Sequence, residues 1–383
     1  MHSRRSERSQ SAKVWSPGSP GNAPIGAGRT AVRGAQGRFN DYSEALSASD
    51  DPAATGEQLL SEVRANFRTF LQARRPDAPF LYWWGPTTTH RTWVRGSGKR
   101  LWNIDPELLR GRMPGHLPDV PEVREDVADY LGEVQAVDAG LGAVLEVLEE
   151  TGERERTMVI VSGDHGLPGV PGGKCNLYDL GTRVSLAVSW PAMVPAGRVV
   201  EDFVSLPDLA PTVLQAAGVE VPAVMTGRSL LEVLKSTAAG QVDATREHVV
   251  IGRERHVAAA RPELLPYPQR ALRTANFLYI RNFAPERWPM GVGPGFGAPA
   301  GPWPDSEKLT NSTFAAFADM DASPTKAWVI EQGLQQPEYR VFFDRAFAQR
   351  PAEELYDLRK DPEQVRNVAT DPAYAEVLRS EGE

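Results

Sequence analysis

The feature that most constrains the fold is a long amphipathic segment followed at once by a short apolar one. From Pro121 to Glu150, apolar side chains recur at the spacing that places them on one face of a helix, and Gly152 lies just past its end. In residues 157–161 every side chain is apolar or β-branched, a pattern typical of a strand buried in a parallel sheet. A helix that leads into such a strand predicts an α/β layered fold.

Further segments extend this alternation of helices and strands. Helical spacing of apolar side chains predicts helices at residues 57–73 and 207–217. Apolar runs predict strands at residues 80–84 and 184–190, and residues 270–282 are typical of short strands. The central part of the chain is therefore expected to be α/β.

The chain is expected to divide into three parts. Residues 1–56 are rich in Ser, Gly, Pro, Arg and Ala, and bury too little apolar surface to offset the entropy of ordering, so we expect them to be largely disordered. Residues 57–236 carry the alternating helices and strands. Residues 237–383 change character and include a stretch dense in Gly and Pro at 288–304, which predicts a smaller α+β domain.

Composition limits the classes of function. A net charge of −8 and a pI near 5.5 provide no basic surface, so we expect no nucleic-acid partner. No apolar run approaches the roughly 18 residues that cross a bilayer, so we expect no transmembrane segment. Cys175 is the single cysteine, which excludes an internal disulfide. The N-terminal residues show no secretory signal, and the oligomeric state and compartment are not assigned by the sequence.

Polar side chains follow the apolar run at 157–161 directly. Asp164 and His165 stand where open α/β sheets gather ligand groups, at the carboxyl end of a strand. The Asp164 carboxylate suits Ca²⁺ or Mg²⁺, and His165 can ligate or donate a hydrogen bond through a ring nitrogen. Farther along, Lys174 supplies a fixed cation of the kind that sulfate and phosphate esters need. The alternatives are a strand-ending turn and a solvated surface lysine.

A histidine follows another apolar run in the same way. His90 comes after residues 80–84, and we expect it at the same edge of the sheet as Asp164. A histidine that titrates near neutrality can protonate a leaving oxygen or nitrogen, although a simple loop residue is the alternative interpretation. Cys175 has no neighbouring base in the sequence, and we expect a buried thiol instead of a nucleophile.

These motifs together resemble a known family, the sulfatases. The motifs that share the order and spacing typical of sulfatases are Asp164-His165-Gly166, Lys174, Gly181-Thr182-Arg183, Trp190-Pro191, residues 205–212, Gly218-Val219 and residues 227–230. Those that resemble its sulfamidase-like (heparan N-sulfatase) branch are Tyr267-Pro268-Gln269-Arg270, Asn282-Phe283, residues 354–357, Asp361-Pro362 and Asn367. The resemblance covers roughly residues 57–375.

The resemblance implies a fold and an activity. The fold would be the alkaline-phosphatase-like sandwich, a mixed and mostly parallel sheet between helices, with residues 57–236 as the remaining part of the catalytic domain and residues 237–383 as a C-terminal α+β subdomain. The activity would be hydrolysis of sulfate esters or sulfamates on sulfated small molecules or glycans. The family uses Ca²⁺ and a formylglycine made from a cysteine or serine, and its members are usually exported or lysosomal.

The resemblance also implies roles for particular residues. Asp164 and His165 match two metal-ligand positions, where the family often has Asn in place of His165. Lys174 matches the lysine that contacts the sulfate, and His90 matches the histidine that protonates the leaving group. Thr87 stands where many relatives have a further histidine. A region that resembles substrate-contacting loops of the sulfamidases contains Glu254, Arg255 and His256.

The sequence departs from the family pattern in its N-terminal part. It contains neither Cys-x-Pro-x-Arg nor the serine form of that motif, and Asp50-Asp51 cannot replace the family's aspartate pair because no apolar strand precedes it. We therefore expect a truncated chain that lacks the nucleophile segment and the first strands, with an incomplete Ca²⁺ ligand set. The alternatives are an inactive sulfatase relative that binds sulfated glycan, and a phosphoester hydrolase of the same superfamily.

Overall fold

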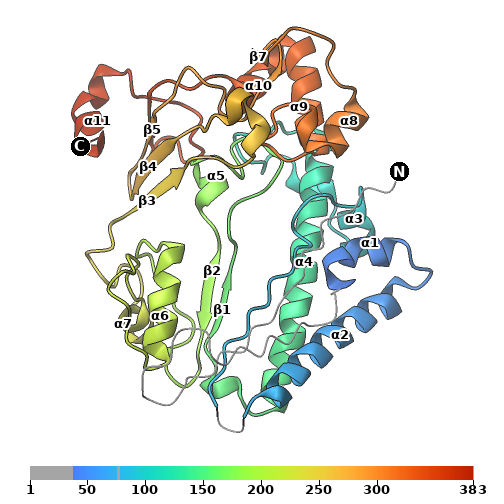
Figure 1. Ribbon diagram of the computed structural model, residues 1–383, viewed down its shortest axis with the longest axis vertical. Helices are drawn as coiled ribbons and strands as arrows, with labels where there is room; N and C mark the ends of the chain where they lie inside the picture. Colours follow the sequence, from blue (N-terminus) through green and yellow to red (C-terminus); the bar gives the residue numbers. More distant parts are fainter. Residues whose placement is uncertain (1–37, 76–77, 383) are drawn as a thin grey trace. The chain divides into compact units, whose positions relative to one another are not determined.

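The computed structural model describes residues 38–75 and 78–382 (Figure 1). The chain divides into two compact units. Unit 1 comprises Met1–Asp105 and Val127–Thr157, and unit 2 comprises Pro106–Asp126 and Met158–Glu383. This division does not coincide with the boundary that we expected between residues 236 and 237.

Unit 1 is helical in its described residues. Its elements are η1 (Arg38–Asp41), α1 (Tyr42–Ser47), α2 (Pro52–Ala73), α3 (Ser97–Trp102), η3 (Arg154–Arg156) and, from Val127 onward, helix α4 (Pro121–Glu150). The helix predicted at 57–73 is confirmed as α2, which begins earlier because Asp51 caps it: its carboxylate accepts a 3.0 Å hydrogen bond from the backbone N–H of Ala54. The helix predicted from Pro121 to Glu150 is confirmed with those bounds.

Part of the segment expected to be disordered is folded. Residues 1–37 lie outside the described residues, but residues 38–56 contribute η1, α1 and the start of α2. Phe39, Tyr42 and Leu46 are buried, and the Phe39 ring lies 5.1 Å from that of Tyr42 and 5.6 Å from that of Trp84. A few aromatic side chains therefore bury apolar surface here, although the segment is polar on average.

The strand predicted at residues 80–84 is wrong, because these residues are not assigned to any strand. The run packs on helix α2 through aromatic side chains instead. The ring of Tyr82 lies 4.5 Å from that of Phe67 and 4.8 Å from that of Phe70, and the ring of Phe80 lies 5.9 Å from that of Phe70. These side chains are apolar because they contact a helix. An apolar run in the sequence does not show whether it packs on a helix or lies within a sheet.

Unit 2 contains a two-stranded ribbon and a four-stranded sheet. The ribbon pairs β1 (Val159–Ser162) with β2 (Leu186–Ser189) in antiparallel register, Val159 facing Ser189. Both strands were predicted, but the expectation of a buried strand in parallel pairing is wrong for β1. Each strand has one neighbouring strand among the described residues, and Val161 of β1 is 38% exposed.

The larger sheet lies in the C-terminal part. Its order is β3 (His248–Arg253), β4 (Gln269–Thr274), β5 (Phe277–Asn282) and β8 (Glu353–Asp357), all antiparallel, which confirms the strands predicted at 270–282. In Figure 1 this sheet lies beside α11 (Ala375–Gly382). The two short strands β6 (Gly293–Pro294) and β7 (Gly297–Ala298) form the only parallel pair of strands among the described residues.

Helices and turns complete unit 2. The α-helices are α5 (Asp179–Thr182), α6 (Leu209–Ala216), α7 (Leu231–Lys235), α8 (Ser306–Asn311), α9 (Pro324–Gln335) and α10 (Arg340–Phe347). The 3-10 turns are η2 (Pro106–Leu109), η4 (Leu206–Asp208), η5 (Ala258–Ala260), η6 (Pro262–Leu264), η7 (Thr313–Ala315), η8 (Pro337–Tyr339) and η9 (Pro372–Tyr374). The predicted helix at 207–217 is confirmed as η4 and α6. A core containing Phe317, Ile330, Phe343 and Phe347 packs α9 against α10.

Candidate functional site

The loop at residues 163–185, between β1 and β2, carries three of the predicted site residues, and glycines fix its path. The backbone N–H of Gly166 donates a 2.9 Å hydrogen bond to the carbonyl of Gly181. A Cβ at Gly166 would lie 1.8 Å from the carbonyl oxygen of Leu180, and one at Gly173 would lie 2.2 Å from that of Leu167. Both positions therefore require glycine, because no side chain fits between two backbone segments this close.

Asp164 and His165 lie together at the start of this loop. The Asp164 Oδ1 atom accepts a 3.0 Å hydrogen bond from the backbone N–H of His165, and the His165 Nδ1 atom lies 2.9 Å from the carbonyl oxygen of Gly166. The Asp164 side chain is 87% exposed. Ca²⁺ requires roughly six to eight oxygen ligands. Among residues 38–75 and 78–382, no group of three or more His, Cys, Asp or Glu side chains could hold a metal, so these two residues do not form a complete site.

Lys174 is held in the interior of unit 2. Its Nζ atom lies 3.1 Å from the Oδ2 atom of Asp321, and the two side chains are only 10% and 11% exposed. The alternative interpretation of Lys174 as a solvated surface lysine is therefore wrong. The ammonium group is therefore a cation of fixed position, and the Asp321 carboxylate offsets part of its charge.

The C-terminal region holds the loop at several further points. These contacts are the Ser323 hydroxyl to the Gly169 carbonyl (2.6 Å), Arg253 to the Cys175 carbonyl, the Tyr178 hydroxyl to Glu354 (2.7 Å), Arg273 to both carboxylate oxygens of Asp179 (2.9 and 3.0 Å), and the Asp179 N–H to Gln364 (2.8 Å). The loop is thus positioned by residues from β3, β4, β8 and the segment before α9.

Cys175 takes part in this structure through its backbone. It adopts a left-handed conformation, with φ of 71°, and its carbonyl accepts the hydrogen bond from Arg253. Burial raises the pKa of its thiol to about 12, so the thiol is not ionised at neutral pH. Because the thiolate is the nucleophilic form of cysteine, Cys175 is not suited to nucleophilic attack, as expected.

A buried aspartate anchors the segment that contains the other predicted site residues. The Asp319 Oδ2 atom lies 2.7 Å from guanidinium nitrogens of both Arg253 and Arg261, and its Oδ1 atom accepts a 2.8 Å hydrogen bond from the backbone N–H of Val257. Asp319 is only 1% exposed. The turn that follows β3 is thereby held on both sides of His256.

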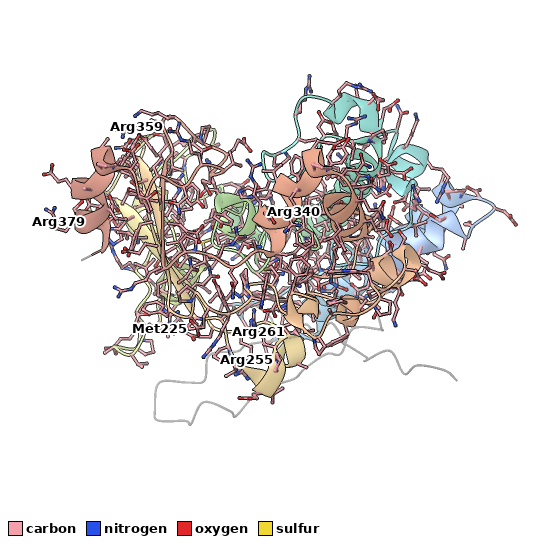
Figure 2. All side chains as sticks on the ribbon, turned by 90° about the horizontal axis from the view of Figure 1, so that it is seen from above. Met225, Arg255, Arg261, Arg340, Arg359 and Arg379 are labelled. Carbon is pink, nitrogen blue, oxygen red and sulfur yellow. The ribbon has the colours of Figure 1, made fainter. Side chains whose placement is uncertain are left out.

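Glu254, Arg255 and His256 lie in this turn. Glu254 forms an ion pair with Arg270, and Arg255, labelled in Figure 2, is exposed. His256 is exposed at this turn, but loss of part of the water around its ring and, after it, the positive charge of Lys174 lower its pKa, whereas Asp321 and Asp319 oppose this effect. His256 therefore lies within electrostatic range of Lys174, and its neutral form is favoured.

His90 belongs to unit 1, whereas Asp164, Lys174 and His256 belong to unit 2. It is exposed, its Nδ1 atom lies 2.8 Å from the carbonyl oxygen of Arg91, and its backbone N–H donates to the carbonyl of Thr87 at 3.0 Å. The His90 ring is thus presented from a tight turn and not from the end of a strand.

Two residues of the site were missed by sequence reasoning. Asp319 and Asp321 flank Met320 directly before Ser323-Pro324, where α9 begins. Two carboxylates that alternate with a buried methionine, just before a helix cap, suggest side chains directed inward toward cations. This alternation is visible in the sequence, but it does not identify the basic residues that the two carboxylates contact.

The comparisons with known proteins assign the family. A profile of the Sulfatase family matches residues 27–219, about half of the chain, and the protein belongs to the sulfatase family. Human N-sulphoglucosamine sulphohydrolase is 32% identical over 276 residues, covering 70% of this chain and 48% of that protein. An ulvan-active sulfatase of Formosa agariphila is 27% identical over 266 residues, covering 70% of this chain and 38% of that protein. The chain spans about half the length, or less, of these relatives.

The solved structures agree with this assignment at the level of the fold. A protein solved in complex with its substrate D-glucosamine-2-N,6-O-disulfate has a TM-score of 0.52 and 18% identity, over 84% of this chain and 67% of that chain. The expected alkaline-phosphatase-like α/β class is confirmed. The mostly parallel sheet of that class is not seen in the described residues, where β6 and β7 alone pair in parallel. No helix in residues 38–75 and 78–382 is both long and apolar enough to cross a membrane.

Proposed function

We propose that this protein is a sulfatase-class hydrolase that acts on sulfated sugars. In the reaction, water and a sulfate ester or sulfamate give inorganic sulfate and a sugar hydroxyl or amine. The observation that carries the proposal is the nearly buried Lys174, fixed in a glycine-constrained loop beside the turn that contains His256. A rigid cation of this kind stabilises a sulfate group without reorganising when the ligand arrives.

Each predicted site residue has a role in this proposal. Lys174, in unit 2, binds a sulfate oxygen. For His90, in unit 1, the family resemblance implies the role of proton donor to the leaving oxygen or nitrogen. Glu254, Arg255 and His256 contact the sugar, and the neutral ring of His256 can accept or donate a hydrogen bond. The support for these roles is the family membership together with the burial and charge of the residues.

Ca²⁺ is part of the proposal only through Asp164 and His165. A divalent cation would supply charge that stabilises the sulfate oxygens, and Asp164 offers an exposed carboxylate for it. The described residues do not complete the ligand set.

A second candidate function is binding of sulfated glycan without hydrolysis. The observation that favours it is Cys175, the single cysteine, whose thiol pKa of about 12 makes it unsuited to attack. The sequence contains no Cys-x-Pro-x-Arg motif that would supply a formylglycine. Under this alternative Lys174 and His256 serve recognition alone.

The experiment that separates the two candidates measures hydrolysis and binding together. Sulfate release from an aryl sulfate and from an N-sulfated heparin disaccharide is measured with Ca²⁺ for the full chain, His90→Ala and a matched variant of an exposed histidine, His248→Ala. Release that His90→Ala abolishes and His248→Ala retains supports the hydrolase. Binding of the disaccharide without release supports the second candidate, and absence of both contradicts the proposal.

A further inference from the structure

The carboxylate of Asp321 occupies the immediate surroundings of Lys174. The Oδ2 atom of Asp321 lies 3.1 Å from Lys174 Nζ, and Asp321 as a whole is 8% exposed. With little water around the pair, the carboxylate offsets part of the positive potential of the ammonium group. An anion that binds Lys174 therefore also meets the negative charge of Asp321.

Hydrogen bonds fix the backbone on both sides of Asp321. The Ser323 hydroxyl accepts a 2.8 Å hydrogen bond from the backbone N–H of Lys326 and donates one of 2.6 Å to the carbonyl of Gly169. The Lys326 ammonium donates to the carbonyls of Thr313, Phe317 and Met320 at 3.3, 3.2 and 2.8 Å, and so closes the backbone before Asp321 into a compact turn.

Asp321 is the buried carboxylate that pairs with Lys174. The other buried carboxylate of the segment, Asp319, is already paired with Arg253 and Arg261. Desolvation and the charge of Lys174 lower the pKa of His256, which favours its neutral form. Lys174 and Asp321 thus place a cation and an acceptor side by side.

We propose that Asp321 is a specificity-determining residue, which makes the site select sulfated ligands that carry a hydroxyl or N–H donor next to the sulfate. The sulfate binds Lys174, and the adjacent donor binds the Asp321 carboxylate. This compensates for the repulsion between that carboxylate and the sulfate. Sugar sulfates and sulfamates have such donors on neighbouring carbons, whereas simple aryl or alkyl sulfates lack them. The inference rests on the proposed sulfate-binding role of Lys174.

A matched pair of small ligands tests this selection. Cyclohexyl sulfate and trans-2-hydroxycyclohexyl sulfate differ by one hydroxyl next to the sulfate, and their dissociation constants for the full chain are measured by NMR titration at pH 7. The hydroxylated ligand is expected to bind about tenfold more tightly, the usual effect of one hydrogen bond to a charged group. Equal affinities in the unmodified protein overturn the inference without any variant.

A second test of the inference replaces the Asp321 carboxylate. In Asp321→Asn the preference is expected to fall to about twofold or less, and cyclohexyl sulfate is expected to bind more tightly than in the unmodified protein because a negative charge has been removed. Asp344→Asn, which alters an exposed carboxylate on α10, is the control and keeps the tenfold preference. A preference retained in Asp321→Asn contradicts the inference.

The outcomes also separate this inference from the proposed function. If both ligands bind equally and Lys174→Met abolishes that binding, the sulfate site stands and the role of Asp321 is wrong. If neither ligand binds to the unmodified protein, both proposals are contradicted.

Discussion

The hydroxyl of Tyr178 donates a 2.7 Å hydrogen bond to the Oε2 atom of Glu354, and this contact joins the loop at 163–185 to strand β8. The Tyr356 hydroxyl donates to the same oxygen at 2.7 Å, and the Asn282 amide donates to Oε1 at 2.8 Å. Burial raises the pKa of both phenols, so each stays protonated and remains a donor. The C-terminal sheet thereby holds the loop that carries Lys174.

Glu354→Gln is expected to destabilise the protein by about 1–3 kcal/mol. The amide group of glutamine donates where the carboxylate accepted, so at least one of its three donors loses its acceptor in the interior. The free energy of unfolding in urea measures the effect. Glu338→Gln, at an exposed position in η8, is the control and should change it by less than about 0.5 kcal/mol. Equal values for both variants would count against the proposed anchor.

His116 is expected to make stability depend on pH between about 6.5 and 4. Burial, and then the charges of Arg350 and Arg345, lower its pKa from 6.5 to about 4 in the folded protein. The unfolded chain therefore binds a proton first as the pH falls. This contribution to stability is fully present above pH 6.5 and is lost progressively down to pH 4, by about 3 kcal/mol.

His116→Phe should remove this part of the pH dependence. The new ring can keep the contact with Tyr178, whose ring centroid lies 4.8 Å from that of His116, and it cannot be protonated. Urea unfolding at pH 7 and at pH 4.5 is the measurement. His248→Phe, at an exposed position in β3, should leave the difference between the two pH values unchanged. An equal pH dependence in His116→Phe and the unmodified protein would show that His116 does not cause it.

Gly166→Ala is expected to destabilise the protein by roughly 1–3 kcal/mol, because its Cβ would lie 1.8 Å from the carbonyl oxygen of Leu180. Gly142→Ala is the matched control in helix α4, where an added Cβ meets nothing within 4 Å. That change should stabilise the helix by roughly 0.5–1 kcal/mol. Thermal unfolding of both variants checks the prediction, and a Gly166→Ala protein as stable as the unmodified one would contradict the tight packing of the loop.

Asp319→Asn is expected to cost roughly 3–5 kcal/mol, since it leaves two buried guanidinium groups, those of Arg253 and Arg261, without a carboxylate. Asp344→Asn removes an exposed ion pair with Arg340, and its effect should stay below about 1 kcal/mol. The two unfolding free energies are compared at the same pH. Equal losses would mean that the Asp319 cluster does not anchor the turn at His256.

The sequence was most informative where the structure depends on local pattern. Helix α4 has the predicted bounds because Pro121 and its apolar spacing act within the helix itself. The predicted burial of β1 failed because burial depends on which strands lie beside it, and β2 is its only neighbour among the described residues. The apolar run at 80–84 could equally form a strand of a sheet or pack on a helix, and the residues of the run do not distinguish these two structures. In the protein it packs on helix α2.

The candidate site was predictable in part for the same reason. Asp164, His165 and Lys174 lie in one loop, so their order in the sequence already groups them. Asp321 contacts Lys174 from a distant part of the chain, and its role follows only from the 3.1 Å distance between the two side chains. An ion pair between residues far apart in the chain produces no recognisable pattern in a single sequence.

The most direct test of the central claim is the affinity for an N-sulfated glucosamine in the unmodified protein, in Lys174→Met and in Lys308→Met, measured by titration calorimetry at pH 7. Lys308 is an exposed lysine in helix α8 of the same unit and serves as the control. If Lys174 binds the sulfate, Lys174→Met should weaken binding by about tenfold or more while Lys308→Met leaves it unchanged. Binding that is equally strong in all three proteins would contradict the sulfate site.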